Sequence, residues 1–277
     1  MNIDQIEDIV ERALAEDLPD ITTDAIFPPE ARGSARFVVK QEGVLAGLPF
    51  ARAVFAVLDR DSSFHILKAD GETVTPGTAV ATVDASVRAL LSGERTVLNF
   101  MQRASGIATL TSRYVAAVEG TGAGIYDTRK TAPGLRALDK YAVRAGGGEN
   151  HRYGLHDMYL VKNNHIDEAG SIRAAIERIR QNGPPMPLMV EVRDLAELQE
   201  ALPLAPDFIL LDNMDLTSLR EAVAMTGGRI PLEASGGVSL DTVRGIAATG
   251  VQRISVGALT HSVMALDISM RVDRLRS

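Results

Sequence analysis

Cysteine and tryptophan are missing from this 277-residue sequence, and aromatic residues make up only 4% of it. The lack of cysteine excludes disulfide bonds, thiolate metal sites and a cysteine nucleophile. No apolar run approaches the about 20 residues that a membrane-spanning helix needs. A net charge of −7 with few aromatic residues is the reverse of the basic surface typical of nucleic-acid-binding proteins. Neither a membrane nor a nucleic acid is therefore expected as a partner.

The rest of the composition is that of an ordinary globular protein, with 45% hydrophobic and 23% charged residues. The length suits one α/β barrel of about 250 residues or two smaller domains. The first 17 residues are acidic and interrupted by polar side chains, unlike a secretory signal peptide. Together with the absence of cysteine, this predicts a cytoplasmic protein.

The first part of the chain mixes helical and strand periodicities. Apolar residues at 3, 6, 10, 13 and 14 predict a helix, and alternation at 35, 37 and 39 predicts a strand. The other elements expected here are a loop at 20–29, a helix at 49–58, and strands at 64–68 and 74–83. A long helical pattern covers 87–118, and Gly93 or Gly106 within it is a break or a close packing point. We expect an amino-terminal domain at 1–112 and a carboxy-terminal domain at 113–277.

Beyond Gly120, short apolar strands alternate with helices. The expected strands are 124–126, 158–162, 187–192, 207–212, 230–234 and 254–257, and the expected helices are 134–145, 167–182, 194–202, 215–225 and 239–249. This alternation predicts an α/β fold with a parallel sheet covered by helices. Without a dinucleotide-binding glycine motif, the strands favour an incomplete, open barrel, although a doubly wound open sheet fits the same pattern.

Each of these strands leads into a polar residue or a glycine. The residues are Asp127 and Arg129, Lys162, Glu191, Asp212, Glu233 and Ser235, and Gly257. Parallel α/β barrels build their active sites at the carboxyl ends of the strands. The sequence therefore predicts a functional site at that edge of the sheet.

A basic segment, residues 127–166, lies in this otherwise acidic chain. It holds seven lysines and arginines against four acids, and three of the five histidines. Arg129 can hold a carboxylate or phosphate through two parallel hydrogen bonds, and the glycines at 146–148 can present backbone N–H groups to an anion. This predicts a pocket for a small polyanion. A solvated turn has the same local pattern, and Lys162 at a strand end also fits a Schiff-base lysine.

Acidic and glycine-rich groups come from the later strands. Glu191 and Asp212 end consecutive strands and together could hold Mg²⁺ or stabilise a developing positive charge, while each alone could cap a helix. The Ser-Gly-Gly segment at 235–237 and the Val-Gly-Ala segment at 256–258 follow the last two strands, where barrels bind phosphate. The later strands therefore complement the cationic half of the predicted site.

Taken together, these segments resemble the quinolinate phosphoribosyltransferase family. The similar blocks are, in chain order, SGERTVLNFMQRASGIAT, DTRKTAPGLRALDKYAV, GGGENHRYGL, LVKNNHI, VEV, ILLDNM, EASGGV and ISVGALTHS. The resemblance covers nearly the whole chain and implies an amino-terminal α/β sandwich domain, an incomplete α/β barrel and at least a homodimer. It also implies conversion of quinolinate and phosphoribosyl pyrophosphate to nicotinate mononucleotide, pyrophosphate and CO₂, with Mg²⁺, in de novo NAD synthesis.

The same resemblance implies roles for single residues. The implied catalytic residues are Lys130, Glu191 and Asp212, of which Glu191 and Asp212 also serve the metal. The implied quinolinate pocket is lined by Arg129, His151, Arg152 and Lys162, with Lys130 reaching toward both substrates and Thr131 also binding substrate. The implied 5′-phosphate site consists of Ser235, Gly236, Gly237, Val256, Gly257 and Ala258. Arg95 matches an arginine that enters the neighbouring subunit's site, and Asn163 stands where family members often have an acid.

Two other functions remain open at this point. Lys162 could be the nucleophile of a Schiff-base aldolase. A related fold associated with molybdenum transport loci would bind a different oxyanion, although the full set of basic residues argues against it.

Overall fold

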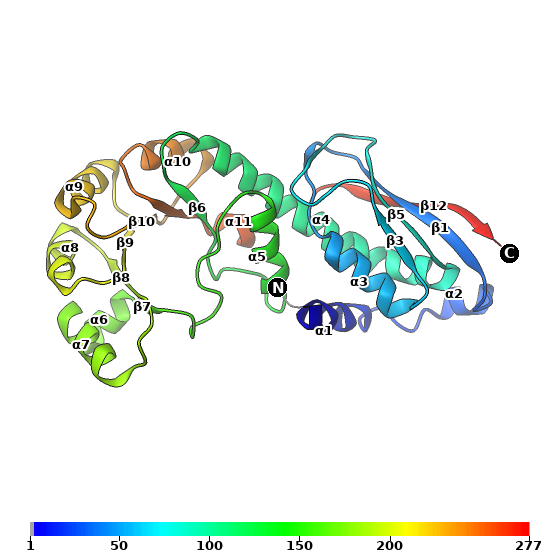
Figure 1. Cartoon of the computed structure of the whole chain (residues 1–277), viewed down its shortest axis with the longest axis horizontal. Coiled ribbons are helices and arrows are strands. Elements are labelled where there is room, and N and C mark those ends of the chain that lie inside the picture. Colours follow the sequence, from blue (N-terminus) through cyan, green and yellow to red (C-terminus); the bar gives the residue numbers. More distant parts are fainter. Residues whose placement is uncertain (1–2, 277) are drawn as a thin grey trace. The chain divides into compact units, whose positions relative to one another are not determined.

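The protein divides into two compact units in a computed structural model that describes residues 3–276 (Figure 1). One unit contains residues 1–112, 131–147 and 259–277, and the other contains 113–130 and 148–258. We call them the antiparallel unit and the parallel unit after their sheets. The sequence predicts one boundary after residue 112, whereas each unit draws on separate segments, because the last strand of the chain pairs with the first. No helix within 3–276 is long and apolar enough to span a membrane.

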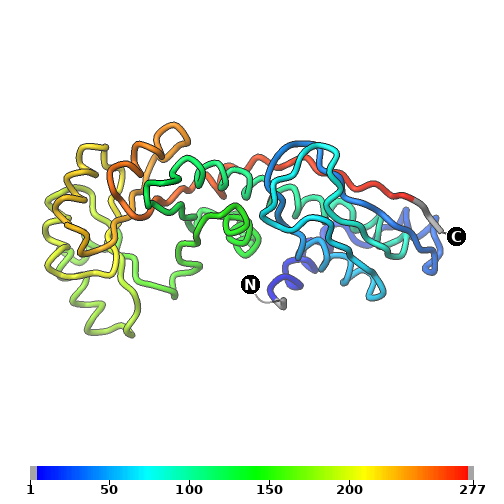
Figure 2. The backbone as a smooth tube through the Cα atoms, turned by 45° about the horizontal axis from the view of Figure 1, so that its top comes forward, coloured from blue at the N-terminus to red at the C-terminus, as the bar shows by residue number. Residues whose placement is uncertain are grey.

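A four-stranded sheet organises the antiparallel unit, in the order β12-β1-β5-β3. Its strands are β1 (Arg32–Val39), β3 (Ser63–Ile66), β5 (Ala79–Ser86) and β12 (Ile268–Arg276), and β2 (Gly43–Val44) and β4 (Thr73–Val74) form a second, two-stranded sheet. The strand predicted at 74–83 is thus divided between β4 and β5. β12 is not predicted by the sequence; it pairs antiparallel to β1, with Met270 opposite Phe37. Figure 2 shows this last strand, in red, running back along the antiparallel unit.

The helices of this unit pack an aromatic core against the sheet. They are α1 (Ile3–Leu14), α2 (Ile21–Ile26), α3 (Leu48–Leu58), α5 (Arg136–Ala145) and most of α4 (Val87–Ala117). The ring of Phe37 on β1 lies 6.2 Å from that of Phe55 on α3, measured between centroids. The loop expected at 20–29 is wrong, because it contains α2. The Asp20 side chain caps this helix by accepting a hydrogen bond from the Thr23 N–H at 3.0 Å.

Helix α4 is continuous over 31 residues, so neither glycine within it is a break. A Cβ at Gly93 would lie 2.8 Å from Leu58 Cδ1, and one at Gly106 would lie 2.2 Å from the Met264 carbonyl oxygen. Both glycines are therefore close packing points, which is the second of the two alternatives that the sequence leaves open. They allow α3 and the segment before β12 to approach the helix.

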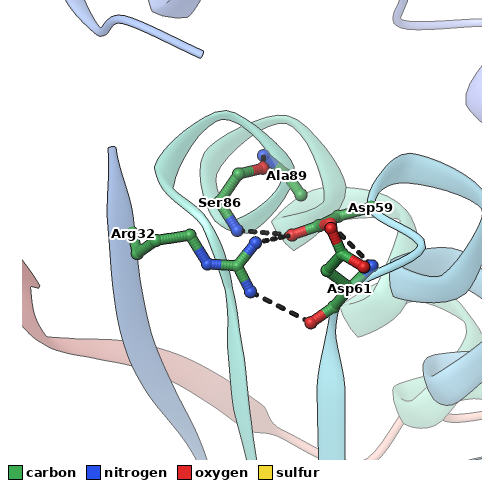
Figure 3. Close-up of polar contacts among 5 residues, drawn as sticks. All are labelled: Arg32, Asp59, Asp61, Ser86 and Ala89. Atoms are coloured by element: carbon green, nitrogen blue, oxygen red, sulfur yellow. Dashed lines mark hydrogen bonds and ion pairs between the residues drawn. The ribbon is translucent and has the colours of Figure 1, made fainter. Parts of the chain in front are cut away.

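A polar cluster ties the start of α4 to the sheet (Figure 3). Asp59 Oδ2 accepts hydrogen bonds from Arg32 Nη1 at 2.8 Å and from the Ser86 N–H at 2.7 Å. Arg32 Nη2 also donates to the Asp61 carbonyl oxygen at 3.0 Å, and Ser86 Oγ accepts from the Ala89 N–H at 3.2 Å. The carboxylate of Asp59 thus joins β1, β5 and the loop after α3.

Six parallel strands form the sheet of the parallel unit, in the order β6-β11-β10-β9-β8-β7. They are β6 (Gly124–Tyr126), β7 (Tyr159–Val161), β8 (Leu188–Val192), β9 (Phe208–Asp212), β10 (Leu232–Ser235) and β11 (Arg253–Ser255). Every residue of β8 is buried, as expected for a parallel strand covered on both faces. β6 and β7 stand at the two ends of this order without pairing to each other among the described strands. The sheet is an incomplete, open barrel, which confirms the predicted α/β fold.

Helices follow the strands along the outside of this sheet (Figure 1). They are α6 (Asn163–Ala169), α7 (Ile172–Asn182), α8 (Leu195–Ala201) with the 3₁₀ turn η1 (Leu202–Leu204), α9 (Leu216–Thr226) and α10 (Leu240–Ala247). The short helix α11 (Ala258–His261) follows β11 and belongs mostly to the antiparallel unit. The helix predicted at 167–182 is two helices. Gly170 ends α6 with a φ of 95°, and Ser171 begins α7 by accepting a hydrogen bond from the Ala174 N–H at 3.0 Å.

Candidate active site

The carboxyl ends of the six parallel strands bring most of the predicted site residues to one edge of the parallel unit. Parallel strands end at the same edge, so residues that leave successive strands become neighbours. The residues at this edge are Asp127 after β6, Lys162 after β7, Glu191 in β8, Asp212 at the end of β9, Ser235 at the end of β10 and Val256 after β11. The prediction that polar strand ends converge is therefore confirmed by the topology.

The Asp127 side chain is buried and holds a neighbouring backbone segment through hydrogen bonds. Its side chain accepts hydrogen bonds from the His151 N–H at 2.8 Å and from Asn150 Nδ2 at 2.6 Å. Its own N–H donates to the Glu149 carbonyl oxygen at 3.0 Å. These bonds hold the segment 149–151 beside the end of β6, and they place His151 and Arg152 at the edge of the sheet.

Two arginines lie close enough at this edge to repel each other. Burial lowers the pKa of Arg152, the positive charge of Arg129 lowers it further, and Asp157 partly offsets both effects. Arg152 Nη1 donates a hydrogen bond to the Met158 carbonyl oxygen at 3.2 Å, which fixes the half-buried guanidinium. Like charges held together are stabilised by an anion that binds both, so this pair is suited to a carboxylate or phosphate.

The imidazole of His151 is buried and in contact with protein on both sides. Its Nδ1 accepts a hydrogen bond from the Arg152 N–H at 2.8 Å, and its Nε2 lies 3.4 Å from Glu233 Oε1. Arg253 Nε holds the other carboxylate oxygen of Glu233 at 2.8 Å. Burial raises the pKa of Glu233, but the neighbouring His151, the charge of Arg253 and the Ser255 hydroxyl outweigh it, so that the pKa is lowered overall.

Lys162 and Glu191 face each other across the ends of β7 and β8. The Nζ of Lys162 is 3.5 Å from Glu191 Oε2, and the lysine side chain is 51% exposed whereas the glutamate is buried. The Lys162 N–H donates to His165 Nδ1 at 2.9 Å, which caps α6. A Schiff-base lysine needs a desolvated, neutral amine. Lys162 is instead half exposed beside a carboxylate, so it lacks the desolvated surroundings of a Schiff-base lysine.

The loops after β10 and β11 contain the residues expected to bind phosphate. Gly236 and Gly237 have φ values of 100° and 57°, and a Cβ on Gly236 would lie 2.0 Å from Asn213 Oδ1. Only glycine fits this close approach to Asn213, whose N–H donates to the Ser235 carbonyl oxygen at 2.8 Å. The chain then enters α10, whose amino terminus presents backbone N–H groups to an anion.

Glu191 and Asp212 lie on the paired strands β8 and β9 at the same edge, where Glu191 is opposite Leu210, two residues before Asp212. Within the described part of the chain, no group of three or more acidic, histidine or cysteine side chains could enclose a metal ion. Mg²⁺ commonly takes only one or two carboxylates and completes its shell with water and substrate phosphates. The donor set therefore fits a magnesium ion that a phosphorylated substrate helps to hold.

Two predicted site residues belong to the antiparallel unit. Arg95 is exposed on α4 and has no ion pair or hydrogen-bonding partner within residues 3–276. Thr131 Oγ1 accepts a hydrogen bond from Arg136 Nε at 3.1 Å. The roles of both residues in substrate binding stay predictions.

Sequence patterns mark Glu233 only as a strand end and do not single out Arg253. A signal for the pair exists, since an acid and an arginine stand in two neighbouring, mostly apolar strands. It becomes visible only with the register, in which Glu233 and Arg253 are direct partners.

Models of two protein families match the chain consecutively. The amino-terminal domain of quinolinate phosphoribosyl transferase matches residues 20–105, and the carboxy-terminal domain of the same enzyme matches residues 107–271. The chain belongs to the quinolinate phosphoribosyltransferase family. This confirms the resemblance found in the sequence.

Individual family members are similar over nearly their full lengths. A nicotinate-nucleotide pyrophosphorylase (carboxylating) of Mycobacterium leprae is 44% identical, over 96% of this chain and 97% of the relative. A mitochondrial quinolinate phosphoribosyltransferase (decarboxylating) of Nicotiana tabacum is 42% identical, over 97% of this chain and 82% of the relative. The crystal structure of NadC from Streptococcus pyogenes superposes with a TM-score of 0.94 at 39% identity, covering 100% of this chain and 98% of that one.

Proposed function

We propose that this member of the quinolinate phosphoribosyltransferase family transfers the phosphoribosyl group of phosphoribosyl pyrophosphate to quinolinate, with loss of CO₂. The products are nicotinate mononucleotide and pyrophosphate, and the reaction belongs to de novo NAD synthesis. The observation that carries the proposal is the pair of like-charged arginines, Arg129 and Arg152, at the functional edge of the open barrel. The names and near-full-length similarity of the relatives support it.

The cationic side of the site accounts for quinolinate binding. Quinolinate carries two neighbouring carboxylates, and Arg129 and Arg152 together supply two planar guanidinium groups that match them. Lys130, which follows Arg129 in the chain, and Lys162, at the end of β7, add positive charge to this edge. A monocarboxylate would leave part of this charge unpaired, so the pocket favours a dicarboxylate.

The acidic side of the site accounts for ribose transfer. Cleavage of the bond between C1 of the ribose and pyrophosphate develops positive charge on the ring, and the carboxylates of Glu191 and Asp212 stabilise that charge. The N–H groups of the 235–237 and 256–258 loops bind the 5′-phosphate. Glu191 and Asp212 would hold Mg²⁺ together with substrate oxygens, and the ion would supply positive charge to offset that of the departing pyrophosphate.

Decarboxylation follows from the bond that has just formed. The ring nitrogen of quinolinate becomes cationic when its lone pair attacks the ribose. The bond from C2 to its carboxylate then breaks and CO₂ leaves. The electron pair stays on C2 next to the positive nitrogen until it binds a proton. The protein's part is to hold the ring and its remaining carboxylate, which the arginine pair does.

We also propose that the enzyme acts as a homodimer in which Arg95 enters the partner's site. Its exposed position on α4 and its lack of an ion-pair partner in the described chain support this role. The cytoplasmic location expected from the sequence stays a prediction.

The function is tested by incubating the protein with quinolinate, phosphoribosyl pyrophosphate and Mg²⁺. Nicotinate mononucleotide and CO₂ should form in equal amounts, and omission of Mg²⁺ should slow the reaction. If no product forms while borohydride traps a carbonyl substrate on Lys162, the protein is an aldolase. If quinolinate does not bind but another oxyanion does, the protein is a binding relative of the same fold.

A further inference from the structure

We propose that Glu233, anchored by Arg253, is a positioning residue for the substrate pocket: it fixes the ring of His151, which in turn holds the backbone of Arg152. Glu233 lies beneath the functional edge, within β10, and is fully buried. The identity of the ligand rests on the proposed function. The contacts that link Arg253 to Arg152 do not depend on the proposed function.

Arg253 is the fixed end of this chain of contacts. Its guanidinium carbon lies 3.9 Å from the centroid of the Tyr126 ring and 4.7 Å from that of Phe208. Its Nε donates to Glu233 Oε2 at 2.8 Å. A planar cation held between two aromatic rings has little freedom, so the carboxylate that it binds is fixed as well.

The hydrogen bonds of His151 determine where its ring proton lies. Nδ1 accepts the Arg152 N–H, so it carries a lone pair and no proton. The proton of the neutral ring is then on Nε2, which faces Glu233 Oε1 at 3.4 Å. That oxygen is buried and accepts no hydrogen bond of good geometry within residues 3–276, so Nε2 is the polar atom that faces it. Glu233 therefore selects one tautomer and one orientation of the ring.

Arg152 is the functional end of the chain of contacts. Its N–H is held by His151, and the preceding N–H, that of His151 itself, is held by Asp127 at 2.8 Å. The backbone at 151–152 is thus fixed on both sides while the guanidinium approaches Arg129. The fixed backbone helps to keep the two like charges close. Loss of Glu233 should therefore loosen the arginine pair and leave the fold intact.

The first test is nuclear magnetic resonance of the histidine ring nitrogens in the wild-type protein at slightly alkaline pH. Selective ¹⁵N labelling and assignment by a His151→Gln variant identify the signal among the five histidines. The proposal predicts the Nε2–H tautomer for His151. A predominant Nδ1–H tautomer, or rapid averaging of the two, overturns it. This readout needs neither substrate nor turnover.

The second test is steady-state kinetics of Glu233→Gln. We expect KM for quinolinate to rise on the order of 10-fold, because Glu233 orients a substrate-binding residue without contacting the substrate itself. KM for phosphoribosyl pyrophosphate should stay within about 2-fold of the wild-type value. The amide proton of Arg152 should shift because its bond to Nδ1 weakens. Equal changes in both KM values, or no change in either, contradict the proposal.

Two further variants separate positioning from folding. Asp207→Asn is the matched control, because Asp207 also accepts a strand hydrogen bond, from the Leu188 N–H at 2.7 Å, but at the opposite end of the sheet. It should leave both KM values unchanged. If Glu233→Gln does not fold, the double variant Glu233→Leu with Arg253→Met replaces the buried pair by apolar groups. It should fold and still show the selective rise in KM for quinolinate.

The outcomes distinguish this proposal from the proposed function. If the wild-type protein does not convert quinolinate, the proposed function fails, and the tautomer of His151 still decides the contact chain. If it converts quinolinate but His151 is in the other tautomer, the function stands and the role of Glu233 is refuted.

Discussion

The antiparallel unit and the functional edge of the parallel unit differ in how they hold charged side chains. In the antiparallel unit, two acids are each held by an arginine: the buried Asp139 accepts two parallel hydrogen bonds from Arg103, each 2.8 Å long, and the half-buried Asp59 binds Arg32. In the parallel unit, Arg129 and Arg152 are held close enough to repel. Paired charges stabilise a scaffold, whereas like charges in proximity prepare a site for a ligand of the opposite sign.

The largest effect should come from removing one member of the like-charged pair. We expect Arg152→Ala to lower kcat/KM for quinolinate about 10²- to 10³-fold, because a half-buried, charge-assisted contact to a carboxylate is lost. The matched control is Arg178→Ala, an exposed arginine of the same unit that only donates to the Ala169 carbonyl oxygen. Equal activity of the two variants would refute the assignment of the pocket.

The second-largest effect should come from removing a charged side chain of the antiparallel unit. Asp59→Ala leaves Arg32 and the Ser86 N–H without their acceptor (Figure 3). The free energy of unfolding should fall by about 1–3 kcal/mol, measured by urea denaturation. KM for quinolinate should not change. A selective loss of quinolinate binding with normal stability would show that the two units are not divided in this way.

Much of this comparison follows from the sequence, because local patterns carry local structure. Apolar spacing predicts α1 and α3, and alternation predicts β1. Residues at the strand ends predict the position of Lys162 and Asp212, since a parallel sheet fixes the edge at which they meet. These features depend on neighbours within a few residues or on the topology alone.

The features that the sequence does not predict depend on distant partners. β12 pairs with β1 from the other end of the chain, and the Glu233–Arg253 contact needs the register of β10 and β11. Whether Gly93 breaks or packs a helix depends on Leu58, which no local pattern identifies. The short helix α2 is held by the Asp20 cap and by Arg88, a distant residue that binds Asp24, and it has too few residues for a periodic signal.

A smaller effect should come from Arg95, which we propose to act in the site of a second copy of the chain. Arg95→Ala should raise KM for quinolinate about 10-fold without changing the stability of the subunit, because the side chain has no partner to lose within residues 3–276. Mixing it with the impaired Arg152→Ala variant should restore activity in hybrid dimers, because one site of the hybrid then contains both arginines. Normal quinolinate binding by Arg95→Ala would show that the arginine does not enter the partner's site.

The smallest effect should come from an exposed ion pair of the antiparallel unit. Lys68 and Glu72 are 3.0 Å apart at the surface. Glu72→Gln should leave both the free energy of unfolding and the turnover rate unaltered within measurement error, because the pair is exposed to solvent. A larger loss of stability would mean that surface pairs, and not the buried ones, support this unit.

The most direct test of quinolinate binding by the arginine pair is a crystal structure of the protein with quinolinate bound. We expect the two carboxylates to contact the guanidinium groups of Arg129 and Arg152, with Lys162 nearby. Glu191 and Asp212 should then face the position of the ribose. Quinolinate bound elsewhere in the molecule, or bound here with its carboxylates turned away from both arginines, would contradict this expectation.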